Sequence, residues 1–298
     1  MNRKIVILFL LLALALSGCG VREEQAQIAA TTAPVYDFTA RLCQGTGLTV
    51  TRLVTEQVSC LHDYSLSVRQ VKAAEGAEVV VISGAGLEEF LEGVIDDTKA
   101  IDASQGIALL APEEGHSHNH DHEEDHGHEG HHHEEDPHIW LSPKNAKVMA
   151  QNICQGLGEK YPQYRVQLED NLTALLADLD ALQAYGEEAL KFLSCRELIT
   201  FHDGFAYLAQ AFGLTILEAV EEESGSEASA QDLKHLIEEV DYHQLPAIFT
   251  EVSGSVSAAG VIARETGAQV FALDMAMAGN SYFDAMYHNI DTLKEALG

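Results

Sequence analysis

Short apolar runs alternate with helical patterns along the first half of the chain. Residues 27–31, 48–54 and 79–83 are apolar runs of strand length, and helical patterns fill 35–43 and 66–75 between them. Strands that alternate with helices are typical of a parallel sheet with crossover helices. This half is therefore predicted to be an α/β lobe.

A second series of the same kind occupies the last hundred residues. Strands are expected at 198–201, 215–220, 247–250 and 269–273, and helices near 204–212, 231–240, 257–266 and 282–297. Ser229 and Asp232 form a capping box before the second of these helices. The pattern predicts a second α/β lobe.

One long amphipathic segment lies between the two series. From 164 to about 190, six leucines recur at intervals of three and four or lie adjacent on one stripe: Leu168, Leu172, Leu175, Leu176, Leu179 and Leu182. A helix of about 25 residues would be about 37 Å long. The segment predicts a rigid helix at 164–193 that joins lobes at 28–163 and 194–298; an extra core helix of a single domain is the alternative.

The first residues have the pattern of an export signal. Arg3 and Lys4 precede an unbroken apolar run at 5–16, which is shorter than the roughly 20 residues that a membrane-spanning helix needs. Small residues and Cys19 close the run. We expect a lipoprotein signal peptide at 1–18, lipid attachment at Cys19 and a tether at 19–27; an ordinary secretory signal is the alternative.

Composition and charge narrow the function. A chain of 298 residues with 46% hydrophobic residues can bury the cores of two lobes. Lys and Arg number 17 against 47 Asp and Glu, so the formal charge is -30. Such a surface repels phosphate backbones, and nucleic-acid binding is excluded.

Four cysteines follow the signal segment: Cys43, Cys60, Cys154 and Cys195. An exported chain can hold disulfides, and four cysteines allow three pairings. Buried free thiols are the alternative. The chain has no CxxC spacing, which gives no support to a cysteine zinc site or a thioredoxin-type motif.

A histidine-rich segment at 113–136 has almost no apolar side chains and is expected to be a flexible loop. Its nine histidines are His116, His118, His120, His122, His126, His128, His131, His132 and His133. Neutral imidazoles at this density can bind Zn²⁺ in many equivalent ways, which predicts several weak sites. A solvated linker without a metal role is the alternative.

Isolated histidines outside the loop point to one ordered site. His138 follows a proline and precedes a helix capped by Ser142. His202 and Asp274 each follow a predicted strand, at the end where α/β proteins hold ligands, and His62 lies between a strand and a helix. Three imidazoles and one carboxylate predict a tetrahedral metal site.

The motifs around these residues resemble a known family. His62-Asp63-Tyr64, the run Asp-Pro-His-Ile-Trp-Leu-Ser-Pro at 136–143, Phe201-His202-Asp203-Gly204 and Leu273-Asp274 together resemble the zinc-binding solute-binding proteins of metal ABC transporters, the ZnuA-like family. The resemblance implies two α/β lobes joined by a rigid helix, with one Zn(II) bound by His62 and His138 from the first lobe and His202 and Asp274 from the second. It also implies a membrane permease as partner, a monomer, and a lipid-anchored protein outside the cytoplasm.

The chain departs from the family pattern at two places. Cys60 stands close enough to His62 to raise the question of a thiolate ligand, and Met275-Ala276-Met277 replaces the Pro-Leu that usually follows the aspartate. Glu251 offers a further carboxylate oxygen. The alternatives are that it binds the metal in competition with the other ligands, that it hydrogen-bonds one of those ligands, or that it makes a structural hydrogen bond.

Ligand type favours zinc over other metals. Manganese-specific relatives have a carboxylate at the third histidine, whereas His202 keeps three nitrogen ligands. Copper or nickel would also bind such a site in vitro. Four protein ligands leave no position for an activated water, and HExxH is absent, so an enzyme is not expected. A surface adhesin, a metal-buffering lipoprotein, and a manganese- or nickel-specific binding protein are the alternatives.

Overall fold

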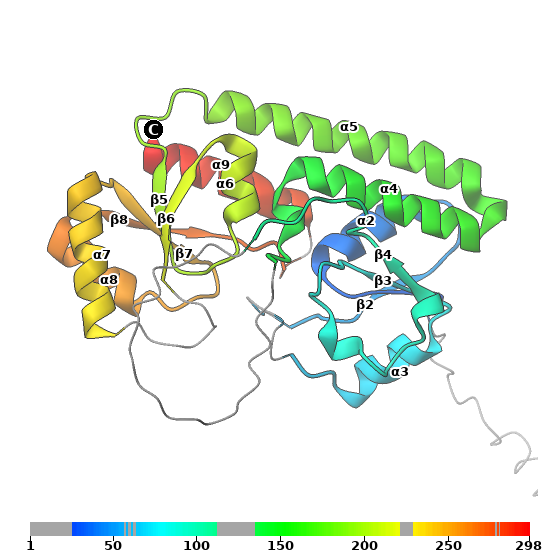
Figure 1. The fold of residues 1–298 in the computed structure, drawn as a ribbon. Helices are drawn as coiled ribbons and strands as arrows, with labels where there is room; N and C mark the ends of the chain where they lie inside the picture. The colour runs from blue at the N-terminus through cyan, green and yellow to red at the C-terminus, as the bar shows by residue number, and fades with distance from the viewer. Residues whose placement is uncertain are drawn as a thin grey trace, which may run out of the picture.

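The first lobe is built on a four-stranded parallel sheet. The structure is a computed structural model, which describes residues 26–56, 58, 61, 64–111, 135–220, 229–277, 279 and 281–298. The strand order is β2 (Val50–Arg52), β1 (Ile28–Ala30), β3 (Val79–Ile82) and β4 (Ala100–Asp102). Helices α2 (Ala33–Leu42) and α3 (Val68–Gly76) connect the first three strands (Figure 1).

The second lobe repeats this arrangement. Its parallel sheet has the order β6 (Thr215–Ala219), β5 (Glu197–Thr200), β7 (Ala247–Glu251) and β8 (Gln269–Leu273). Its helices are α6 (Ala206–Phe212), α7 (Ala230–His243), α8 (Ser257–Thr266) and α9 (Tyr282–Leu297). In each sheet the first strand in chain order has the second on one side and the third on the other. Ligands of such sheets bind outside the carboxyl ends of the strands at this switch point.

Two long helices follow one another in the middle of the chain, and the second of them links the lobes. Helix α4 (Pro143–Lys160) begins at Ser142, whose hydroxyl accepts the N–H of Asn145, as the cap pattern predicts. Helix α5 (Arg165–Ala189) has 25 residues and packs on α4 in the first lobe and on α9 in the second. In Figure 1 it runs along the top of the molecule above both lobes. The predicted α/β architecture with a long connecting helix is confirmed.

Most predicted elements lie within a few residues of the observed ones. The capping box at Ser229 and Asp232 is present. Strand β4 is an addition, because its three half-buried residues make no apolar run that could be recognised in the sequence. Short 3₁₀ turns complete the chain at η1 (Glu89–Leu91), η2 (Asp97–Lys99), η3 (Ile139–Leu141) and η4 (Pro162–Tyr164).

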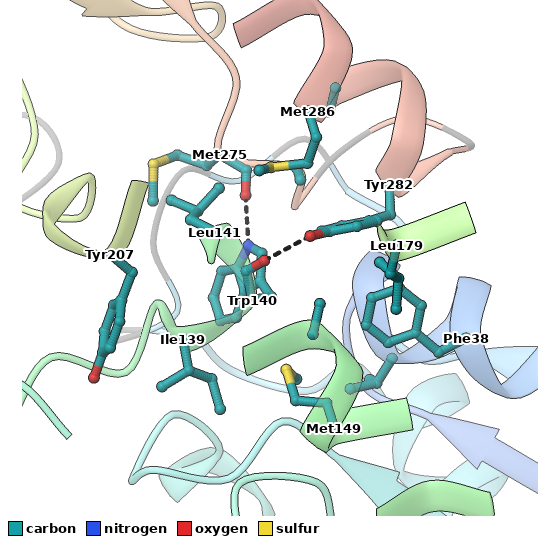
Figure 2. Packing of buried hydrophobic residues seen from close by; sticks show 14 of the residues in the cluster. Phe38, Ile139, Trp140, Leu141, Met149, Leu179, Tyr207, Met275, Tyr282 and Met286 are labelled. Carbon is teal, nitrogen blue, oxygen red and sulfur yellow. Dashed lines mark hydrogen bonds between the residues drawn. The ribbon is translucent and has the colours of Figure 1, made fainter. Parts of the chain in front are cut away.

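A continuous apolar core joins the lobes around Trp140. The indole Nε1 of Trp140 donates to the carbonyl of Met275 at 2.8 Å, and the hydroxyl of Tyr282 donates to the carbonyl of Trp140 at 2.9 Å (Figure 2). Trp140 and Tyr282 are both buried, and the Tyr282 ring meets Phe38 of α2 edge to face. Residues from both lobes and from α5 therefore share one core.

The described cysteines carry free thiols. Cys43 and Cys154 are buried, and Cys195 is half-buried. Burial raises the pKa of the Cys43 thiol to about 12. The alternative of buried free thiols therefore holds for Cys43 and Cys154, while Cys60 lies outside the described residues.

Candidate metal site between the lobes

His138 is held at the junction between an extended segment and η3. Its side chain is 2% exposed, and its imidazole meets the Trp140 ring edge to face. Oδ1 of Asp136 accepts the backbone N–H of His138 at 2.9 Å and lies 2.8 Å from its Nδ1. The backbone turn and the orientation of the ring are thus fixed by the same carboxylate oxygen.

His202 lies just beyond the carboxyl end of β5, at the switch point of the second sheet. Its side chain is 6% exposed, and its Nδ1 lies 3.2 Å from Oε1 of Glu251, the last residue of β7. The hydroxyl of Thr200 donates to the carbonyl of His202. Each candidate imidazole therefore has a carboxylate at its Nδ1 side.

The glycine after His202 gives the ring its space. A Cβ at Gly204 would lie 2.7 Å from Cδ2 of His202 and 2.6 Å from the methyl carbon of Met275. Any larger residue would displace the imidazole or the methionine. The His-Asp-Gly sequence therefore has a steric reason in this fold.

The two imidazoles approach each other from opposite lobes. The ring centroids of His138 and His202 are 5.4 Å apart, with their planes at 82°. This is the pair of predicted ligands that the structure places in contact. Separate lobes supply the rings, so a ligand bound by both would be in contact with both lobes.

Asp274 is positioned by the backbone that follows β8. The side chain of Asn289 in α9 bonds the N–H and the carbonyl of Asp274, each at 2.7 Å. Its Oδ1 accepts the N–H of Ala276, which has φ of 57°. The next residue, Met275, contacts Trp140 through its carbonyl and would crowd a side chain at position 204 beside His202.

The structure describes only part of the predicted ligand set. Among the described residues, no three His, Cys, Asp or Glu side chains are grouped as a metal site. His62 and Cys60 lie outside the described residues, as do Cys19 and the nine histidines at 116–133. Of the predicted ligands, the structure therefore describes three. His138 and His202 are in contact, and Asp274 lies on the loop after β8, next to Met275.

Sequence reasoning missed two residues that support His138, one directly and one through Asp136. It assigned no role to Asp136, although its spacing of two residues from His138 is the signal for a side chain that accepts the backbone N–H at i+2. It also missed Tyr207 of α6, whose hydroxyl donates to the carbonyl of Asp136 at 3.0 Å. That contact joins the lobes and has no local sequence signal. Burial raises the pKa of Tyr207, so the hydroxyl keeps its proton.

Two α/β lobes that each contribute one buried histidine to a shared contact define the fold of a bilobed binding protein. The family model for the zinc-uptake complex component A periplasmic (ZnuA) matches residues 28–296. The chain therefore belongs to this family.

Known relatives agree with the fold. The zinc-binding lipoprotein AdcA of Streptococcus pneumoniae serotype 4 is 30% identical over 99% of this chain and 61% of its own length. A crystal structure of ZnuA is 31% identical, with a TM-score of 0.76, over 92% of this chain and all of that chain. Zn(II)-bound AdcA from Streptococcus pneumoniae is 27% identical, with a TM-score of 0.74, over 92% of this chain and 58% of that chain. The chain thus spans about 61% of the length of the curated relative.

Proposed function

We propose that this protein captures Zn(II) outside the cytoplasm and delivers it to the permease of an ABC transporter. The observation that carries the proposal is the pair of buried imidazoles, His138 and His202, whose ring centroids are 5.4 Å apart and which come from different lobes. Family membership and relatives named for zinc binding support it.

The proposed ligands are His62, His138, His202 and Asp274. Three imidazoles and one carboxylate suit Zn²⁺, which takes nitrogen and oxygen ligands in a tetrahedral shell. A manganese site would favour more oxygen. Four protein ligands leave no coordination position for an activated water, so the role is carriage of the metal and not catalysis.

The proposed location is the outer face of a bacterial cell membrane. Lipid attachment at Cys19 would anchor the protein there, with residues 19–27 as its tether. The protein is proposed to act as a monomer. The relative AdcA is named a lipoprotein. Among the described residues, no helix combines the length and the apolar character needed to cross a membrane.

The histidine-rich loop is proposed to be an auxiliary zinc binder. Its nine imidazoles at 116–133 would supply several weak sites, because each bound ion must order a chain that has almost no apolar side chains. The tight site and the weak sites should therefore appear as separate phases in a titration.

Metal content and competitive affinity test the proposal. The full chain should bind one zinc tightly, in preference to manganese. Loss of a residue that hydrogen-bonds a metal ligand weakens metal affinity by about 10–100-fold. His202→Ala removes a ligand itself and should weaken the affinity of the tight phase by more than this. His235→Ala, which removes a half-exposed histidine of α7, is the matched control and should leave the tight phase unchanged.

Two results would reject the proposal. One is a wild-type tight phase in His202→Ala, and the other is a tight phase that prefers manganese over zinc. Zinc uptake by cells that lack this protein, measured against cells that produce it, then separates delivery to a permease from adhesion or buffering.

A further inference from the structure

Asp136 has contacts with both lobes and with a candidate ligand. Its Oδ1 accepts the backbone N–H of His138 at 2.9 Å and lies 2.8 Å from Nδ1 of the same residue. Its backbone N–H donates to the carbonyl of Leu110 at 2.9 Å, and its own carbonyl accepts the hydroxyl of Tyr207 at 3.0 Å. One residue therefore connects the first lobe, helix α6 of the second lobe and the His138 imidazole.

We propose that Asp136 is a positioning residue, which holds His138 in the tautomer with the proton on Nδ1 and ties that orientation to the second lobe through Tyr207. The inference rests on the proposed function, because the Nε2 atom that this tautomer leaves unprotonated is the proposed zinc ligand. It adds a residue outside the four proposed ligands to the zinc site.

The tautomer follows from hydrogen-bond chemistry. An ionised carboxylate only accepts hydrogen bonds, so an imidazole nitrogen 2.8 Å from Oδ1 must carry the proton. A neutral imidazole then has its lone pair on Nε2. Metal-binding histidines commonly donate their other ring N–H to a carboxylate, which fixes the ring and increases its basicity.

Two other aspartates of the first lobe accept the N–H of the residue two positions ahead, and the comparison shows how Asp136 differs from them. Oδ1 of Asp102 accepts the backbone N–H of Ser104 at 2.8 Å and its hydroxyl at 2.7 Å. Oδ1 of Asp96 bonds Thr98 in the same way. These aspartates stabilise a turn through a residue two positions ahead. At Asp136 the same turn places an imidazole where the others place a hydroxyl.

The surroundings of Asp136 add an electrostatic reason. Its side chain is 9% exposed, and Oδ2 is buried with no hydrogen-bond partner among the described residues. A buried carboxylate oxygen without a donor is costly unless positive charge lies nearby. A cation on Nε2 of His138 would supply that charge. A turn alone would not require it.

Tyr207 extends the effect to the other lobe. Its hydroxyl also accepts the N–H of Leu110 at 2.9 Å, so it joins the segments on both sides of Asp136. Its side chain is buried, with 1% exposure. Because Tyr207 belongs to α6, a movement of the second lobe would displace Asp136 through the Tyr207 hydrogen bond. Asp136 would in turn displace the His138 ring.

His202 has a matching partner. Oε1 of Glu251 lies 3.2 Å from its Nδ1. In both of these proposed zinc ligands, the ring nitrogen that is not next to a carboxylate is therefore Nε2. Each has a carboxylate behind it from its own lobe.

Histidine ring NMR of the metal-free full chain provides the direct test. Two-bond ¹H–¹⁵N correlations should show His138 with its proton on Nδ1. Asp136→Ala should abolish this preference and weaken the tight zinc phase by about 10–100-fold. Asp136→Asn keeps an oxygen that can accept from Nδ1 and should restore the tautomer and part of the affinity. Asp102→Ala, which removes the matching turn bonds, should change neither.

The outcomes separate this inference from the proposed function. An Nε2-protonated His138 in the wild-type protein would overturn the inference even if no variant folded. So would an Asp136→Ala protein with the zinc affinity of Asp102→Ala. By contrast, wild-type zinc affinity in His138→Ala would reject the proposed ligand set and leave the tautomer result standing.

Discussion

Glu88 is a buried carboxylate that the sequence patterns do not mark, and it fixes the carboxyl ends of two strands. It accepts the hydroxyl of Thr31 after β1 and the N–H groups of Ser83 and Gly84 after β3. Burial raises its pKa from the ordinary 4.5 to about 7, against the opposing effect of these bonds. At the residue scale, the first lobe therefore holds a carboxyl group that titrates near neutral pH.

Glu88 should make stability fall as pH rises. Between about 4.5 and about 7 the folded protein holds a proton that the unfolded chain has released, so the free energy of unfolding decreases across this range. The full effect is on the order of 3 kcal/mol. Glu88→Gln should lack this component. Urea unfolding from pH 4.5 to 8 would measure it, and identical pH profiles for both proteins would contradict it.

The hydroxyl of Tyr282 should contribute to stability through one interlobe bond. In Tyr282→Phe the buried carbonyl of Trp140 loses its donor, which should cost about 1–3 kcal/mol of unfolding free energy. Tyr185→Phe removes a hydroxyl bonded to Asp291 at an exposed site and should cost less than about 0.5 kcal/mol. Chemical denaturation compares the two, and equal losses would show that the interlobe bond has no special weight.

At the element scale, two helix glycines differ in whether a neighbouring side chain leaves room for a Cβ atom. A Cβ on Gly186 of α5 would lie 2.2 Å from the Phe212 ring of α6, whereas a Cβ on Gly260 of α8 would meet nothing within 4 Å. Gly186→Ala should therefore destabilise the protein by about 1–3 kcal/mol through overpacking. Gly260→Ala should stabilise it by about 0.5–1 kcal/mol, because alanine favours the helix. Thermal unfolding of both variants checks the opposite signs.

The elements could be predicted from the sequence because their patterns are local. The leucine stripe of α5 and the apolar runs of β7 and β8 are continuous in the chain. Strand β4 could not be predicted, since Ala100–Asp102 is three half-buried residues at the edge of the sheet. The sequence offers Glu251 as an oxygen near the metal, but its pairing with His202 has no local signal, because it depends on β5 and β7 being neighbours.

The whole molecule holds its lobes together beside the candidate site. The segment that follows Asp274 is bonded to the first lobe at separate points. Trp140 binds the carbonyl of Met275, Arg52 of β2 donates to the carbonyl of Gly279 at 2.6 Å, and Asp37 of α2 accepts the N–H of Tyr282 at 3.0 Å. Helix α5 and the shared core add to these contacts. These interlobe contacts therefore hold His138 of the first lobe at a fixed distance from His202 and Asp274 of the second.

The same framework predicts that the histidine-rich segment can be removed without loss of the fold. The N–H of Asp136 bonds the carbonyl of Leu110 at 2.9 Å, and Tyr207 bonds both residues, so the chain on either side of the segment is already joined. Deletion of 113–135 with a two-glycine link should lower the total zinc bound and keep one tight site. Because imidazole must be neutral to bind metal, the weak phase of the intact chain should disappear first as pH falls through about 6.5. Calorimetric titration of the deletion variant measures both phases. A variant with a loop of equal length in which serine replaces every histidine is the control for chain length. If the tight phase were lost and the weak phase kept, the assignment of the two kinds of site would be reversed.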